Sequence, residues 1–351
     1  MSVLPAASQT RQRVIVLVLA ACALLALALA AAGLAGSVPV PLADLPQALS
    51  SVLSGAPDGM SATLLDLRLG RASAAFVTGA ALALAGVMMQ ALVRNPLADP
   101  YVLGVSAGAA VGALAALLFG AALWMVDLGA LAGAVGISLL LYLLARRDLG
   151  GLRGGGRGAV RTGESGVLLL TGVVLASACM ALVTLMLSVA PESRLRGMVF
   201  WMIGDLAGAS WRPLPWVVLG AAVLLALRRA RALNVMALHA DAAVALGIDV
   251  AAERRFLFLC SGLLTACAVT TGGSIGFVGL VVPHACRHAF GPDHRILLPA
   301  ATLVGGSFLV LADTLARTVL APQQLPVGVL TSLIGVPVFL FQLHQLHLRR
   351  R

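Results

Sequence analysis

Apolar stretches of about 20 residues recur along almost the whole chain, with only short polar breaks between them. A stretch of this length crosses the hydrocarbon core of a bilayer as one α-helix. Hydrophobic residues occupy 60% of the 351 positions and charged residues only 11%, so the chain has too little polar surface to cover a soluble core. We therefore expect an all-α, polytopic membrane protein.

Ten segments reach this length when those with internal polar breaks are included, namely residues 14–36, 67–92, 100–119, 122–145, 165–189, 211–230, 250–271, 275–290, 295–320 and 327–347. Residues 193–207 are too short to span and carry charges, so we expect a short helix there that dips into the bilayer from one side. No segment is long and polar enough for a separate soluble domain. A single transmembrane domain of about ten helices is therefore expected over residues 1–351.

The arginines supply all 24 basic side chains, because the sequence contains no lysine. In a ten-span arrangement 18 of them fall on one side, and the positive-inside bias therefore predicts that both termini are cytoplasmic. The formal net charge of +10 does not indicate nucleic-acid binding, since the chain offers no soluble basic face. The other six arginines, at outer helix ends, are Arg68, Arg71, Arg194, Arg196, Arg212 and Arg317.

The polar run Arg94-Asn95-Pro96-Leu97-Ala98-Asp99-Pro100 ends one apolar segment and opens the next. Backbone breaks at membrane depth are tolerated only where protein or a water-filled cavity satisfies their polar groups. The run therefore favours a transport pathway over a wall that faces only lipid. Close packing of the neighbouring helices is indicated by glycines at four-residue spacing, at Gly104, Gly108 and Gly112 and at Gly129 and Gly133.

Neither catalysis nor metal binding is indicated by the sequence. The five cysteines stand singly in apolar segments, without the paired spacing of metal ligands. Residues 272–276 are glycine-rich but lack the lysine of a phosphate-binding loop, and no nucleophile–base spacing is recognisable. His284 and His288 lie at an expected helix C-terminus, where positive charge is favourable. We expect no enzymatic activity, no cofactor and no metal.

Several sequence blocks, in this order and spacing, carry a resemblance to a known family. They are Arg68-Leu69-Gly70-Arg71, residues 90–108, Gly204-Asp205-Leu206, residues 276–284 (GFVGLVVPH) and residues 325–331 (LPVGVLT). From about residue 14 to residue 345 the chain resembles the permease subunits of bacterial ABC importers for iron chelates, haem and vitamin B12. Gly70 departs from the family, which often has proline in the basic block.

The resemblance implies a type II importer in the bacterial inner membrane. Two permease subunits of ten helices each would form a homodimer around a central path. Two cytoplasmic ATPase subunits would drive transport, and a periplasmic binding protein would deliver the cargo. The chain itself would be the non-catalytic, membrane-spanning subunit.

A cytoplasmic segment at about 234–248 is similar to the coupling loop of ABC transporters. The pattern of Asp-Ala-Ala, three residues and then glycine is met by Asp241, Ala242, Ala243 and Gly247, with aspartate in place of glutamate. The resemblance implies that this segment, with Leu238, docks on the ATPase. Alanines allow close docking, and a glycine permits the turn that ends the helix. An ordinary connecting helix is the alternative.

Arg68, Arg71 and Arg317 match positions at which the resembling permeases present arginines to acidic residues of the binding protein. Charge pairs across such an interface set register and association rate more than affinity. Local pairing is the alternative, because Asp313 lies four residues before Arg317 and Asp66 lies near Arg68.

The stretch that holds Arg194, Arg196, Met198 and Met202 places two cations beside apolar and aromatic residues at the outward end of the fifth span. Arginine binds carboxylates in a bidentate manner, so we expect this stretch to line the translocation pathway. Interfacial arginines beside ordinary packing residues are the alternative.

The inner gate is placed by the resemblance at Asn95, Leu97 and Ser165. Asn95 before Pro96 is also a natural helix stop, and both interpretations can hold together.

Haem is the cargo that the pathway residues favour, because it is a flat apolar macrocycle that bears carboxylates. Ferric siderophores come second and cobalamin third. An ion-coupled secondary carrier, which belongs to a different class, would need carboxylates near the middle of the membrane. The deepest candidate is Asp313, and its expected pairing with Arg317 weakens this alternative.

Overall fold

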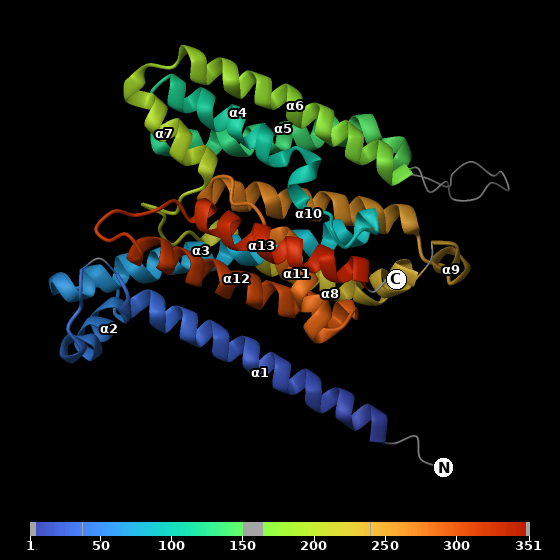
Figure 1. The fold of residues 1–351 in the computed structure, drawn as a ribbon, viewed down its shortest axis with the longest axis horizontal. Coiled ribbons are helices and arrows are strands. Elements are labelled where there is room, and N and C mark those ends of the chain that lie inside the picture. The colour runs from blue at the N-terminus through green and yellow to red at the C-terminus, as the bar shows by residue number, and fades with distance from the viewer. Residues whose placement is uncertain (1–4, 37, 150–163, 239, 349–351) are drawn as a thin grey trace.

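The structure is a computed structural model that describes residues 5–36, 38–149, 164–238 and 240–348. Within these ranges all regular structure is helical and no strand occurs, which confirms the all-α prediction. Most helices run alongside one another between two ends of a bundle (Figure 1). We call them the α9 end, where α9 (Ala240–Ala245) lies and α13 (Val327–Leu348) ends, and the α2 end, where α2 (Leu45–Leu53) lies.

Each of the ten predicted segments coincides with a helix in the described part of the chain. Besides α13, these helices are α1 (Pro5–Leu34), α3 (Gly59–Val93), α4 (Val105–Leu118), α5 (Leu123–Leu149), α6 (Glu164–Val189), α8 (Pro213–Leu238), α10 (Val250–Gly272), α11 (Val278–Phe290) and α12 (His294–Thr318). Two 3-10 turns, η1 (Leu42–Asp44) and η2 (Pro100–Leu103), join them. The predicted short helix at 193–207 is α7 (Glu192–Ile203).

Two of the predicted spans are shorter than expected. Among the described residues, six helices are long and apolar enough to cross a membrane: α3, α5, α6, α10, α12 and α13. Of the other four predicted spans, α1 and α8 contain 30 and 26 residues. By contrast, α4 and α11 contain only 14 and 13, about 20 Å of helix, against a hydrocarbon core of roughly 30 Å. The segments 100–119 and 275–290 therefore hold short helices, about two-thirds of the core thickness, that follow irregular backbone, because Pro100 begins the first segment and Gly276 lies near the start of the second.

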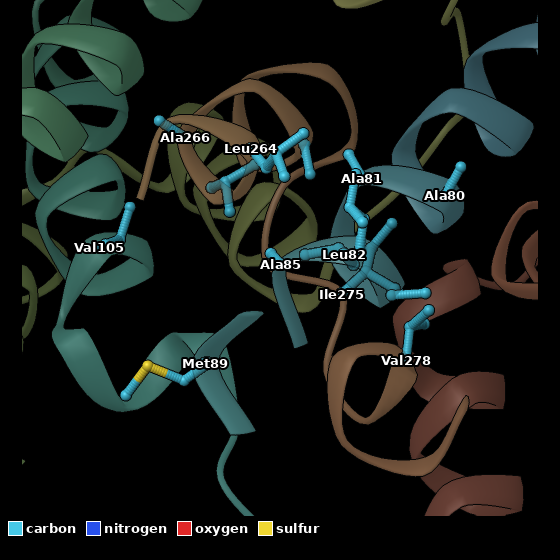
Figure 2. Close-up of a cluster of buried hydrophobic side chains, with 14 of the residues drawn as sticks. Ala80, Ala81, Leu82, Ala85, Met89, Val105, Leu264, Ala266, Ile275 and Val278 are labelled. Atoms are coloured by element: carbon cyan, nitrogen blue, oxygen red, sulfur yellow. The ribbon is translucent and has the colours of Figure 1, made fainter. Parts of the chain in front are cut away.

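The centre of the bundle is α3. Its apolar stretch is 94% buried, whereas those of α5 and α6 are 22% buried. The buried face of α3 is rich in small residues such as Ala80, Ala81 and Ala85, which let neighbouring helices approach closely. Figure 2 shows these alanines in one cluster with Leu264 of α10 and Ile275. The irregular backbone between α10 and α11, which contains Ile275, therefore lies inside the core.

Pairs of glycines join α4 to α5. A Cβ on Gly112 would overlap the carbonyl oxygen of Gly129, and one on Gly108 would lie 2.5 Å from the carbonyl oxygen of Gly133. The two backbones are therefore in direct contact, which confirms the close packing expected from the glycine spacing.

Candidate functional site

Two interrupted helices meet inside the bundle. The first interruption separates α3 from α4 and contains η2, and the second, residues 273–277, separates α10 from α11. Asp99 fixes η2, because its Oδ1 accepts a hydrogen bond of 2.7 Å from the N–H of Tyr101. Arg94 and Gly104 have left-handed φ angles of 54° and 75°. The polar break predicted from the sequence is therefore a turn of defined geometry.

Tyr101 joins the two interruptions. Its hydroxyl donates to the carbonyl oxygen of Ile275 at 3.0 Å and accepts from the N–H of the same residue at 3.1 Å. The hydroxyl of Ser106 donates to that of Ser274 at 2.9 Å. The two Tyr101 bonds satisfy the backbone N–H and carbonyl oxygen of Ile275, as the interior of a membrane protein requires.

Two glycine-containing blocks, far apart in sequence, also meet beside residues 273–277. The N–H of Gly328, in the first turn of α13, donates to the carbonyl oxygen of Gly204, which follows α7, at 3.1 Å. A Cβ on Gly204 would lie 2.7 Å from the carbonyl oxygen of Ser274. Only glycine permits such an approach. The sequence marked these blocks through their family resemblance, but no local pattern predicted that they meet.

The predicted gate residues Asn95 and Leu97 lie in the turn that follows α3. The side-chain oxygen of Asn95 accepts a 3.0 Å hydrogen bond from the N–H of Leu97. Asn95 is exposed and Leu97 is half-buried. The side chain of Ser165 lies outside the described residues, so its distance from the other two is not defined.

The arginines near the α2 end form an internal network around Asp313, which is 1% exposed. Arg71 donates from Nη2 to Asp313 Oδ1 at 2.7 Å, and its Nε bonds both oxygens at 3.0 Å. Arg317 Nε lies 3.2 Å from Asp313 Oδ2. The local pairing considered for Arg317 is therefore present, and Asp313 also pairs with Arg71, on a different helix.

Arg68 caps the end of α1. Its guanidinium donates to the carbonyl oxygens of Gly33 at 2.9 Å and Leu34 at 3.1 Å, and also to that of Val38. Arg317 reaches the carbonyl oxygen of Ala32 at 3.4 Å. Positive groups are favourable at a helix C-terminus, so α3 and α12 both hold the last turn of α1.

A cavity of about 560 Å³ opens beside this network. The three arginines line it and are 6–8% exposed, and Arg71 and Arg317 share one buried carboxylate, that of Asp313. An excess of positive charge therefore faces the cavity. Its other lining residues include Asp66, Trp211 and Gln324.

The predicted pathway residues on α7 point in different directions. Arg194 donates to the carbonyl oxygen of Leu118 and so caps α4, while Met198 is fully buried in the core. Arg196 is exposed, with its guanidinium 5.4 Å from the ring centroid of Phe200. Met202 is half-buried. Local packing, the alternative weighed from the sequence, accounts for Arg194 and Met198 in this conformation.

The predicted coupling segment forms α9 and the turn after it. The N–H of Gly247 donates to the carbonyl oxygen of Val244 at 2.9 Å, and Gly247 has a φ of 77°, so the glycine ends the helix as expected. Ala243 is buried against the adjoining ends of α8 and α10. Leu246 is 70% exposed. Three predicted coupling residues have side chains outside the described structure: Leu238, Asp241 and Ala242.

Near α9, polar contacts join α8 to α10 and to the start of α12. Arg229 of α8 forms a 3.0 Å ion pair with Glu253 of α10. Asn234 donates to Asp293 Oδ1 at 2.7 Å and accepts from the N–H of His294 at 2.8 Å. Burial opposes ionisation of Asp293, but hydrogen bonds from the N–H of Arg295 and from Asn234 outweigh it and lower its pKa. No sequence pattern predicted these contacts, since the partners are 24 and 59 residues apart.

Candidate metal ligands do not gather in one place. Within the described ranges, no group of three or more His, Cys, Asp or Glu side chains could hold a metal ion. The Nε2 atoms of His284 and His288 lie 3.1 Å apart as a pair on α11.

Comparison with known proteins gives a consistent result. Residues 23–345 match the FecCD transport family. The chain is 39% identical over 321 residues to a cobalamin import system permease protein of Halobacterium salinarum, a match that covers 90% of this chain and 82% of the other. It is 40% identical over 282 residues to a vitamin B12 import system permease protein of Escherichia coli, covering 79% and 82%. A solved inward-facing structure described as a metal-chelate type ABC transporter is similar with a TM-score of 0.78 and 30% identity, over 95% of this chain and 99% of that one.

Proposed function

Because the chain belongs to the FecCD transport family, as an ABC importer permease, we propose that it carries cobalamin into the cytoplasm. In the proposed importer two copies of the chain form the path, two cytoplasmic ATPase subunits hydrolyse ATP, and a periplasmic binding protein delivers the cargo. The observation that carries the proposal is the 39–40% identity to two cobalamin permeases over 79–90% of the chain.

Haem, which the sequence placed first, has less support than cobalamin. The argument for haem depended on Arg194 and Met198 lining the path, but Met198 is fully buried and Arg194 caps α4. We retain Arg196 and Met202, together with Asn95 and Leu97, as pathway and gate candidates. An ion-coupled carrier is disfavoured, because Asp313 is held by two arginines and is not free to exchange an ion.

Uptake into liposomes tests the cargo. With the chain, its ATPase and its binding protein reconstituted, ATP is expected to drive uptake of cyanocobalamin at least about tenfold faster than of haem or a ferric hydroxamate, a ratio that corresponds to about 1.4 kcal/mol. A variant ATPase that binds but does not hydrolyse ATP is the control.

Each outcome of the uptake experiment has a distinct meaning. ATP-driven uptake of haem or the hydroxamate in preference to cyanocobalamin would replace the proposed cargo and leave the importer architecture intact. Uptake that is independent of ATP but follows an ion gradient would support the carrier instead.

We propose further that α9 and its following turn dock on the ATPase. The support is that Leu246 is exposed in the turn where Gly247 ends α9. This turn lies between α8 and α10, which are joined by the ion pair of Arg229 and Glu253. An apolar side chain that is 70% exposed at the tip of a connecting segment is suited to a groove on another protein.

Leu246→Glu is expected to reduce ATP-driven uptake at least about tenfold, because the lost burial is worth about 1.5–3 kcal/mol and the added charge opposes docking. The amount and the melting temperature of the Leu246→Glu protein should match those of the wild type. Leu246→Met is the matched control, because methionine keeps an apolar side chain of similar volume at the same exposed position. Equal uptake by Leu246→Glu and wild type would exclude this docking site.

The orientation and the remaining partners follow from the same proposal. With α9 in the cytoplasm, both described termini lie on the cytoplasmic side and the cavity lined by Arg68, Arg71 and Arg317 opens to the periplasm. Its excess positive charge suits acidic residues of the binding protein. The apolar stretches of α6 and α13, only 22% and 28% buried, supply surface for the second permease subunit and for lipid.

A further inference from the structure

The coupling segment is connected to the middle of the bundle by one unbroken helix. Asp249 caps the start of α10, because its Oδ1 accepts a 2.9 Å hydrogen bond from the N–H of Ala252. From there α10 runs for 23 residues to Gly272 and contains no proline. Such a helix moves as a rigid element, so a shift at α9 displaces residues 273–277.

At its far end this helix is bound to the turn that carries the gate candidates. Tyr101 holds both the N–H and the carbonyl oxygen of Ile275, and Ser106 holds Ser274. Tyr101 lies in the same interruption as Asn95 and Leu97, and the Asp99 cap fixes η2 around it.

We propose that Tyr101 is a positioning residue that couples the turn bearing the gate to α10, and through it to the coupling segment. The inference rests on the proposed importer function. The approach of Gly204 to Ser274 is a contact of one backbone with another, which resists compression but not separation, and the hydrogen bond from Gly328 to Gly204 does not involve residues 273–277. The two hydrogen bonds of the Tyr101 hydroxyl resist separation, so they transmit movement in both directions.

The test is Tyr101→Phe, which removes the hydroxyl and keeps the ring. Cyanocobalamin imported per ATP hydrolysed is expected to fall about tenfold, within the usual range of coupling between sites, while ATP hydrolysis by the partner subunits persists. Tyr142→Phe is the matched control, because Tyr142 is the only other tyrosine and packs its ring 6.0 Å from that of Phe258.

A second readout does not depend on the cargo. In a background without native cysteines, Leu97→Cys is labelled with a maleimide that does not cross the membrane, and the labelling rate is expected to change when ATP is added. Tyr101→Phe should abolish that change and Tyr142→Phe should not. If Tyr101→Phe does not fold, Ser106→Ala is measured instead, with the same expectation.

The outcomes separate this inference from the proposed function. If the wild type imports no cyanocobalamin but labelling of Leu97→Cys responds to ATP and Tyr101→Phe abolishes that response, the proposed cargo is wrong and the coupling stands. The coupling role is overturned if labelling of Leu97→Cys does not change with ATP, or if it changes equally after Tyr101→Phe and Tyr142→Phe. An unchanged ratio of cargo to ATP in Tyr101→Phe also overturns it.

Discussion

Replacing Asp313 with leucine is expected to destabilise the folded protein by about 3–5 kcal/mol, the usual cost of leaving a buried charge without its partner. Asp313 is 1% exposed and is shared by Arg71 and Arg317, so its removal leaves two buried cations. The loss should appear as a large drop in the melting temperature of the detergent-purified protein and in the amount of monodisperse material.

An exposed ion pair in the same protein provides the control. Arg212 and Asp127 approach to 2.6 Å, but their side chains are 49% and 31% exposed. Asp127→Asn should therefore cost less than about 1 kcal/mol. Similar melting temperatures for Asp313→Leu and Asp127→Asn would show that burial adds nothing to the network around Asp313.

Charge reversal at Arg71, which would test docking of the binding protein, also affects the network around Asp313. Arg71→Glu would place a second carboxylate against Asp313, 2.7 Å from the present guanidinium, and would disturb the fold directly. Weaker capture of the binding protein by such a variant supports docking only if its melting temperature matches that of the wild type.

Gly112→Leu is expected to cost about 3 kcal/mol, at the upper end of what overpacking usually costs. A Cβ on Gly112 would overlap the carbonyl oxygen of Gly129, and two backbones cannot yield as a flexible side chain can. Separation of α4 from α5 would open the core beside the first interruption. A large decrease in melting temperature is the expected measurement.

Gly136→Ala is the control, because Gly136 lies on α5, the helix that Gly112 of α4 contacts, but a Cβ there meets nothing within 4 Å. Alanine favours helix by about 1 kcal/mol over glycine, so this variant should be neutral or more stable than the wild type. If Gly112→Leu and Gly136→Ala melt at the same temperature, the glycine contact between α4 and α5 is not a stabilising interface.

Hydropathy predicted where helices occur but not how far each one extends. The segments at 100–119 and 275–290 are apolar throughout much of their length, so hydropathy alone cannot distinguish a helix too short to span from a spanning one. The prolines and glycines at their starts were visible, and they are the reason that the backbone is irregular there.

The candidate site was predicted where it depended on local sequence and missed where it depended on distant contacts. Gly247 ends α9 as its residue type requires, and Asp313 pairs with Arg317 four residues later. The second partner of Asp313 is 242 residues away, and the Tyr101–Ile275 bonds join residues 174 apart. Such pairs follow from the packing of whole helices, which a single sequence does not encode locally.

The capping of α1 has a consequence for the order in which the chain matures during synthesis. Its last turn is completed by Arg68 of α3 and by Arg317 of α12, and the contact of Arg317 with Ala32 joins residues 285 apart. Arg71 likewise has no carboxylate partner from this network until α12 has been made. The last turn of α1 is therefore fully capped only after α12 has been made, and a nascent chain that stops before α12 leaves Arg71 without its carboxylate partner.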